Sequence, residues 1–223
     1  MARTQAPVRP RRRVRPRRRR GRGQLFLPGA ILLLLGALAL FLFFKRAKGS
    51  PVEPLPEPLP PWIQQELLPI NEWSRPGTAM DGINGIVVHY VGNPGTTARQ
   101  NRSYFEGLAQ SHETYASSHF LVGLDGEVLL CVPPGEIAYC SSTRNHDTIS
   151  IEVCHPDDAG AFTPESYRSL VQLVNWLRAV YALEPDQVIR HYDVTGKECP
   201  RYYVEYPEAW AGFKADLLAA EEE

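Results

Sequence analysis

An uninterrupted apolar run lies near the N-terminus of the chain. Leu25 to Phe44 reads LFLPGAILLLLGALALFLFF, which is twenty uncharged residues. At about 1.5 Å of rise per residue, a helix of this length crosses the roughly 30 Å hydrocarbon core of a bilayer. A soluble core helix is rarely apolar on every side over such a length. The run therefore predicts a transmembrane segment and excludes one uniform soluble globule.

A cleaved signal peptide is the other interpretation of this run. Its apolar region would usually span about 7–15 residues and end at small residues. Here the run is longer, and Lys45, Arg46 and Lys48 follow it directly. We therefore expect an uncleaved signal anchor.

Charge divides the chain at the same place. The 24 Lys+Arg and 25 Asp+Glu give a formal net charge of −1, yet residues 1–48 carry +14 and the other 175 residues carry −15. Eleven Arg precede the apolar run and three basic residues follow it. This asymmetry predicts a single-pass protein of the cell membrane, with a cytoplasmic N-terminus and an extracytoplasmic C-terminal domain. The Arg tract could also be a nucleic-acid arm, but beside a membrane span it favours a topology signal, so we expect no nucleic-acid partner.

Four parts of the chain follow from these patterns. They are a basic cytoplasmic tail (1–24), a transmembrane signal anchor (25–44), a Pro-rich linker (45–64) and a C-terminal domain (65–223). Six prolines between Pro51 and Pro61 favour an extended polyproline II spacer in the linker. The residues that remain suit one compact domain with a sizeable core.

The sequence of the C-terminal domain predicts an alternation of strands and helices. Apolar, β-branched runs predict strands at 83–90, 148–154 and 188–191, and a turn signal at 124–127 predicts a hairpin of 118–122 with 128–132. Helices are expected over 98–109, from Thr163-Pro164 onward, and over 208–218. The expected fold class is α/β, a single domain with a mixed central β-sheet flanked by helices.

Three side chains at the ends of these elements could bind a metal. His89 ends the first strand, His191 ends the last strand, and Cys199 follows in the next loop. Two imidazoles and one thiolate can hold Zn²⁺ and leave a fourth position open for water, as in catalytic zinc sites. The spacing is not that of a zinc finger, and a lone histidine is more often an ordinary surface or core residue.

Four segments carry a resemblance to a known family. They are IVVHYVGNPG (86–95), SSHFLVGLDGEVLLCVP (117–133), TISIEVCHP (148–156) and VIRHYDVTGKECP (188–200). Together, and in this order, they closely resemble the zinc-dependent N-acetylmuramoyl-L-alanine amidases of the type 2 family, relatives of the peptidoglycan recognition proteins. The resemblance runs from about residue 70 to residue 213, and the anchor and linker lie outside it.

The resemblance implies roles for particular residues. It implies that His89, His191 and Cys199 are the zinc ligands. It also implies that Glu152 is the catalytic residue that assists the zinc-bound water, and that Lys197 stabilises the developing oxyanion.

Further residues match the family with less defined roles, and one segment departs from it. The resemblance places His119, Tyr90 and Asn93 in contact with the substrate or behind the ligands. Many members have a histidine in an Ala-Trp-His-Ala segment, where this chain has Ala-Tyr-Cys-Ser at 138–141. A substrate contact is therefore in question there, whereas the metal ligands are not.

The implied function is that of a membrane-anchored peptidoglycan hydrolase. It would cleave the amide between N-acetylmuramic acid and L-alanine of the stem peptide, with Zn²⁺ as cofactor and a muramyl peptide as substrate, and we expect a monomer. A non-catalytic peptidoglycan-binding module and a zinc peptidase that cuts within the stem peptide are the alternatives. Cys131, Cys140 and Cys154 could form one disulfide and leave one thiol, or all stay reduced as small apolar residues.

Overall fold

The computed structural model describes residues 52–219. The predicted basic tail and signal anchor lie outside the described residues. Within residues 52–219, no helix is both long enough and apolar enough to span a bilayer.

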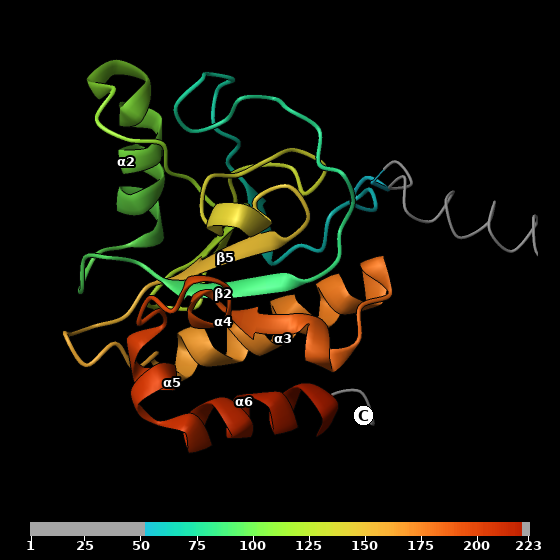
Figure 1. The fold of residues 1–223 in the computed structure, drawn as a ribbon, viewed down its shortest axis with the longest axis vertical. Helices are drawn as coiled ribbons and strands as arrows, with labels where there is room; N and C mark the ends of the chain where they lie inside the picture. Colours follow the sequence, from blue (N-terminus) through green and yellow to red (C-terminus); the bar gives the residue numbers. More distant parts are fainter. Residues whose placement is uncertain (1–51, 220–223) are drawn as a thin grey trace, which may run out of the picture. The chain divides into compact units, whose positions relative to one another are not determined.

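The described elements follow one another as an alternation of strands and helices (Figure 1). The strands are β1 (Ile63–Gln65), β2 (Ile86–Tyr90), β3 (Phe120–Val122), β4 (Val128–Leu130), β5 (Ile149–Val153) and β6 (Val188–Arg190). The α-helices are α2 (Ala98–Ser111), α3 (Pro164–Tyr181), α4 (His191–Thr195), α5 (Arg201–Glu205) and α6 (Pro207–Ala219). Two short 3₁₀ helices, η1 (Ser142–Arg144) and η2 (Pro185–Gln187), precede β5 and β6.

All six strands form one mixed sheet in the order β1-β4-β3-β5-β2-β6. The β3–β4 hairpin is antiparallel, and every other neighbouring pair is parallel. The predicted mixed α/β sheet with its single hairpin is confirmed. The central strands β5 and β2 run side by side in the same direction, so their carboxyl ends meet at one edge.

Strand alternation separates two apolar clusters, one on each face of the sheet. On β5, Ile149, Ile151 and Val153 face the cluster that contains α3 and α6. The opposite face packs against α2 through Ala98 and Phe105. Figure 1 shows α2 on one side of the sheet and α3 with α6 on the other. Because successive side chains of a strand point to opposite faces, Glu152 lies on the α2 side, as its position between Ile151 and Val153 predicts.

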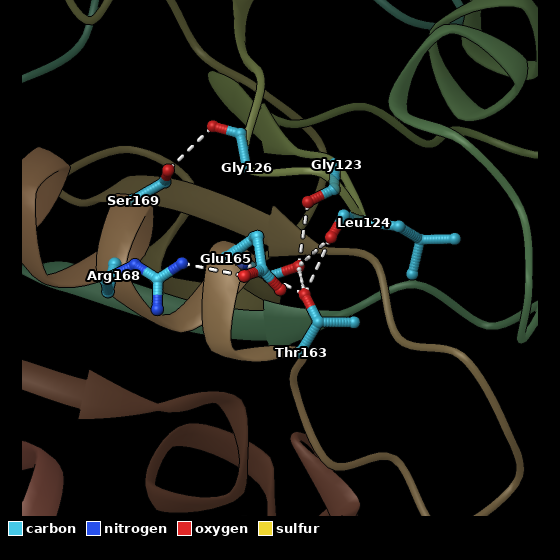
Figure 2. Close-up of polar contacts among 8 residues, drawn as sticks. Gly123, Leu124, Gly126, Thr163, Glu165, Arg168 and Ser169 are labelled. Atoms are coloured by element: carbon cyan, nitrogen blue, oxygen red, sulfur yellow. Dashed lines mark hydrogen bonds and ion pairs between the residues drawn. The ribbon is translucent and has the colours of Figure 1, made fainter.

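Helix α3 begins where the sequence predicts it, with Thr163 as N-cap and Pro164 in the first turn. Figure 2 shows how the N-terminal part of α3 is bonded to the β3–β4 turn: Thr163 Oγ1 donates to the Leu124 carbonyl at 2.7 Å, and Ser169 Oγ donates to the Gly126 carbonyl at 2.7 Å. Gly126 has φ +84°, and a Cβ there would lie 2.7 Å from Ser169 Oγ. A side chain at this turn would therefore be strained and would separate the hairpin from α3.

The described fold begins before the predicted boundary at residue 65. Leu55, Leu59 and Trp62 pack against the α3 and α6 cluster, and Ile63 opens β1, which pairs with β4. The part of the expected spacer from residue 52 to residue 64 is thus docked on the domain and does not extend from it as a free rod. Apolar side chains between the prolines give it surface to bury.

One strand end also differs from the prediction. β6 ends at Arg190, and His191 is the first residue of α4 rather than the last residue of the strand. All four cysteines are free thiols. Cys131 and Cys154 are completely buried in the α2-side cluster, where they behave as small apolar residues.

Candidate metal centre

The site forms at the carboxyl ends of β2 and β5, on the face that packs against α2. His89 and Glu152 are direct partners in the parallel β2–β5 pairing. Equal register on neighbouring parallel strands places both side chains on the same face and next to each other. The two strands are apolar on their other face, so burial of the core fixes this register and with it the His89–Glu152 pair.

Two further side chains join His89 from the C-terminal part of the chain. Ligand atoms of His89, His191 and Cys199 all lie within 4.8 Å of one another. Cys199 Sγ is 3.8 Å from His89 Nδ1, and the two imidazole centroids are 4.6 Å apart. Short helix α4 carries His191, and the Tyr192 amide donates to the Cys199 carbonyl at 2.9 Å, which folds the loop back onto the helix. The three residues predicted as metal ligands are therefore brought together.

The donor set fits a zinc ion. His191 Nδ1 is buried and has no hydrogen-bond partner, which a metal would supply. His89 Nε2 lies 3.1 Å from Ser141 Oγ. A proton on Nε2 would bind that hydroxyl and leave the Nδ1 lone pair on the side of Cys199, which is how a supporting hydrogen bond selects the tautomer of a metal ligand. Two nitrogens and one sulfur are donors that Zn²⁺ accepts, with one position left open.

Protonation of the ligands is consistent with a bound cation. Burial, reinforced by His191 and Lys197, holds the pKa of His89 well below its ordinary value, so the imidazole is neutral and can coordinate. Burial raises the pKa of the Cys199 thiol to about 12. Without a cation the thiol would stay protonated at neutral pH, and a metal would be needed to hold the thiolate.

Glu152 is a buried carboxyl group beside the candidate ligands. Burial raises its pKa to about 7, against smaller opposing effects of Cys140 and Lys197. Its Oε1 accepts a hydrogen bond from Cys140 Sγ at 3.4 Å, and its Oε2 is buried without a partner. A carboxyl group with a pKa near neutrality can both accept and return a proton, which suits a general acid–base catalyst.

A cavity of about 300 Å³ opens onto these groups. Its lining includes the three candidate ligands, Glu152 and the exposed residue Lys197. The rest of the lining comes from residues around the metal site and from α2: Tyr90, Gly92, Phe105, Ala116, Ser117, Tyr139 and Cys140. The arrangement can therefore admit a substrate to a bound metal, a carboxyl group that can exchange protons, and a positive charge.

The remaining predicted residues lie in three different places. Tyr90 lines the cavity, with its ring 4.9 Å from that of His155. Asn93 is exposed and does not line the cavity; its carbonyl accepts a hydrogen bond from Thr96 Oγ1. His119 is completely buried behind the cavity lining.

His119 links strand β5 to the segment that contains Glu136. The Ser150 amide donates to its Nδ1 at 2.9 Å, and its Nε2 donates to the Glu136 carbonyl at 2.9 Å. Burial lowers the pKa of His119 to about 4, so the ring is neutral. Its contacts support the site from behind rather than reach into it.

Sequence reasoning missed Cys140 as a site residue and counted it only among the possible disulfide partners. Cys140 lines the cavity, and its Sγ, a donor atom of Glu152 and one of His89 all lie within 4.8 Å of one another. Its neighbour Ser141 bonds His89. Both residues lie in the Ala-Tyr-Cys-Ser segment that departs from the family pattern. That departure is the sequence feature from which they could have been predicted as site residues.

The family model described as N-acetylmuramoyl-L-alanine amidase matches residues 79–202, which is more than half of the chain. Among curated relatives, a probable N-acetylmuramoyl-L-alanine amidase of Bacillus licheniformis is 33% identical over 147 residues, covering 60% of this chain and 41% of the relative. The N-acetylmuramoyl-L-alanine amidase CwlL of the same organism is 32% identical over 155 residues, covering 64% and 42%. The matched part thus spans less than half the length of these relatives.

Solved structures agree with the fold. A mutant endolysin from Bacillus subtilis is 28% identical with a TM-score of 0.60, covering 70% of this chain and 97% of that chain. The catalytic domain of XlyA has the same identity and TM-score and is covered over 98% of its length. The PlyL structure, at 21% identity and a TM-score of 0.60, shows the shared fold alone.

Proposed function

The chain belongs to the N-acetylmuramoyl-L-alanine amidase family, and from this membership and its metal centre we propose that it hydrolyses the amide between N-acetylmuramic acid and L-alanine in peptidoglycan. The observation that carries the proposal is the convergence of His89, His191 and Cys199 on one cavity with Glu152 beside them. Such a set of groups has no role in core stability, because it leaves polar atoms of Glu152 and His191 buried without partners.

Amide hydrolysis needs a nucleophile, a proton carrier and stabilisation of negative charge. The three ligands would hold Zn²⁺, which when bound supplies a Lewis acid and lowers the pKa of a water ligand to about 7. Glu152 would take the proton of the attacking water and return it to the leaving amine, for which a pKa of about 7 is well matched. Lys197 would place its ammonium near the carbonyl oxygen as negative charge develops there.

The retained thiol supports an enzyme over a binding module. A protein that only binds peptidoglycan has no need of a complete ligand set, whereas here Cys199 lies 3.8 Å from His89 Nδ1. A peptidase that cuts within the stem peptide would use the same groups. The bond that is broken therefore has to be identified from the products.

The test is to treat cell-wall sacculi with the full chain in detergent and to analyse the products by mass spectrometry. We expect stem peptides with a free N-terminal L-alanine. Glu152→Ala should lower the rate at least about a hundredfold, because general acid–base catalysis contributes that much or more, and should leave the zinc content unchanged. Glu205→Ala, an exposed glutamate on α5, is the matched control and should keep full activity.

Each other outcome overturns part of the proposal. Peptide fragments that retain the muramoyl–alanine bond would establish the peptidase alternative. Binding to sacculi without any new amino terminus would establish the binding module. Full activity of Glu152→Ala would refute the proton-transfer role.

We further propose that the domain is held at the outer face of a membrane. The support is the run of twenty uncharged residues at 25–44 and the excess of Arg before it. Protease added to intact cells should degrade the C-terminal domain and leave the N-terminal tail protected. Recovery of the full chain in the soluble fraction would refute the anchor.

A further inference from the structure

We propose that an aromatic wall beside the metal centre, formed by Trp73, His112, Tyr115 and Tyr139, binds the glycan strand of the substrate. This inference rests on the proposed amidase function and adds a subsite for the sugar chain. It assigns a role to residues that neither the ligand set nor the proton transfer uses.

The wall is a continuous series of ring contacts. The Trp73 ring stacks on His112 at 4.7 Å and 14° and on Tyr115 at 4.5 Å and 16°. Tyr115 in turn meets Tyr139 edge to face at 5.4 Å. Tyr115 is 48% exposed although it has two aromatic neighbours. Exposed aromatic groups of this kind mark interaction sites more often than isolated apolar residues do.

The aromatic wall joins the cavity directly. Tyr139 lines the cavity together with Ala116 and Ser117, which follow Tyr115 in the chain. A ligand that occupies the cavity and continues past Tyr139 would therefore meet Tyr115 next. The wall is an extension of the site and not a separate patch.

Main-chain hydrogen bonds hold the three segments of the wall in place. The Ala116 amide donates to the Trp73 carbonyl at 3.2 Å, and the Ser117 amide donates to the Tyr139 carbonyl at 3.1 Å. Asn71 Oδ1 accepts from the Trp73 amide at 2.8 Å and fixes the turn in which Trp73 lies. A preformed surface loses little conformational entropy when it binds a ligand.

The chemistry of the wall fits a sugar chain. A pyranose ring presents a face of C–H groups that packs on an aromatic ring, while its hydroxyl groups stay at the rim and bond polar neighbours. Tyr115 Oη donates to Glu72 Oε1 at 3.3 Å, so an exposed carboxylate stands beside the rings as an acceptor for hydroxyl or amide hydrogens.

Charge distinguishes between the two arms of the substrate. The amide to be cleaved joins an uncharged glycan, whose lactyl carboxyl is consumed in that bond, to a peptide that carries carboxylates. Glu72 beside the wall disfavours the anionic peptide and tolerates the neutral glycan. Lys197, the cation of the cavity lining, comes from a different segment and is not part of the wall.

The test compares kcat/KM on a muramoyl peptide with a single sugar and on a long glycan chain that carries the same peptide. In Tyr115→Ala the preference for the long glycan should fall about three- to tenfold, the range of an aromatic contact. Tyr115→Phe, which keeps the ring, should retain most of the preference. Tyr206→Ala removes a tyrosine of similar exposure, 46%, on another part of the surface and should leave the preference unchanged.

Binding of an uncharged oligomer of N-acetylglucosamine, which has no lactyl carboxylate, to the Glu152→Ala protein, with and without Tyr115→Ala, separates this inference from the proposed function. Loss of binding with Tyr115→Ala supports the wall even if no amide is cleaved. An unchanged long-glycan preference together with unchanged binding overturns the wall, although the amidase activity would stand. If Tyr115→Ala does not fold, Tyr115→Leu gives the same comparison with less loss of packing.

Discussion

The ligand side of the cavity and its aromatic wall are constructed in different ways. His89 and Glu152 stand at the ends of central parallel strands, and His191 starts the helix that follows the next strand. The wall is assembled from three loops far apart in the chain, around residues 73, 112–117 and 139. The strand ends are fixed by core packing, whereas the loops are fixed by a few hydrogen bonds and ring contacts.

Under the proposed function, this difference separates the residues that would carry out the reaction from those that would bind the glycan. A one-residue slip of β2 against β5 would move His89 and Glu152 apart and expose core side chains, so the fold protects the reacting groups. A change in a loop alters only the surface that the substrate meets. If the two sides are independent, a substitution in the ligand set should leave glycan binding largely unchanged, and a substitution in the wall should leave zinc binding largely unchanged.

Loss of a ligand should have the largest effect. Cys199→Ala removes the only sulfur among the three ligand atoms. We expect zinc to be lost and the rate to fall on the order of a thousandfold, because the metal supplies several kcal/mol of transition-state stabilisation. Metal analysis and product release measure both. Glycan binding by the aromatic wall should persist, and its loss would show that the two sides are not separable.

Cys131→Ala is the matched control for this experiment. Cys131 is also a fully buried free thiol, but it lies in the α2-side core and touches neither ligand nor cavity. The variant should keep its zinc and its activity. It should lose only the modest stability that follows from a small cavity.

The buried carboxyl of Glu152 should produce the next largest effect, on stability. Its pKa rises from 4.5 to about 7 on folding because burial disfavours the charged form. The free energy of unfolding therefore falls progressively as pH rises from 4.5 through 7. The total loss is about 3 kcal/mol once Glu152 is ionised in both the folded and the unfolded protein. Glu152→Gln does not titrate, so in excess chelator the variant should be more stable than the wild type at about pH 8 by up to that amount.

Urea unfolding at a series of pH values measures this difference. Near pH 4 the Glu152 carboxyl is mostly protonated in both the folded and the unfolded protein. Wild type and variant should therefore be closest in stability there. Glu205→Gln, at an exposed position on α5, should show no such trend. A wild-type to variant difference that stays constant across the pH range would mean that Glu152 is not held in a desolvated environment.

The same contrast explains how much the sequence could predict. His89 and Glu152 could be placed because alternation along a strand determines which face a side chain occupies. The α3 cap was evident from Thr163 and Pro164, which act locally. Strand β1 was missed because it has only three residues and gains its stability from pairing with β4, which no local pattern records. His191 was expected to end a strand, since a helix of five residues leaves no periodic signal.

Cys140 and the aromatic wall could not be found in this way. Trp73, Tyr115 and Tyr139 are separated by long stretches of chain and meet only in the folded structure, where their loops converge. Contacts between distant loops depend on the whole fold, whereas strand alternation and helix caps depend on neighbours. Strand alternation therefore accounts for His89 and Glu152, whereas the loop residue Cys199 was predicted from its residue type and the family resemblance, and the wall was not predicted.

The smallest predicted effect tests the support of the aromatic wall. Arg75 holds the loop that carries Trp73: its Nε and one terminal nitrogen each bond Glu136 at 2.7 Å, and the other terminal nitrogen bonds the Leu68 carbonyl at 2.7 Å. Lysine cannot reproduce this fork, so Arg75→Lys should lower the free energy of unfolding by about 1 kcal/mol. We expect the long-glycan preference to fall about twofold, a fraction of one aromatic contact.

Arg99→Lys is the control, because the Arg99 side chain is 58% exposed and its pair with Glu66 is screened by solvent. It should change stability by only a few tenths of a kcal/mol. The decisive measurement is the zinc content of Arg75→Lys, which should equal that of the wild type because its partners lie outside the ligand set. Loss of zinc together with glycan preference would mean that the loops help to position the ligands, and that the strand ends do not define the metal centre on their own.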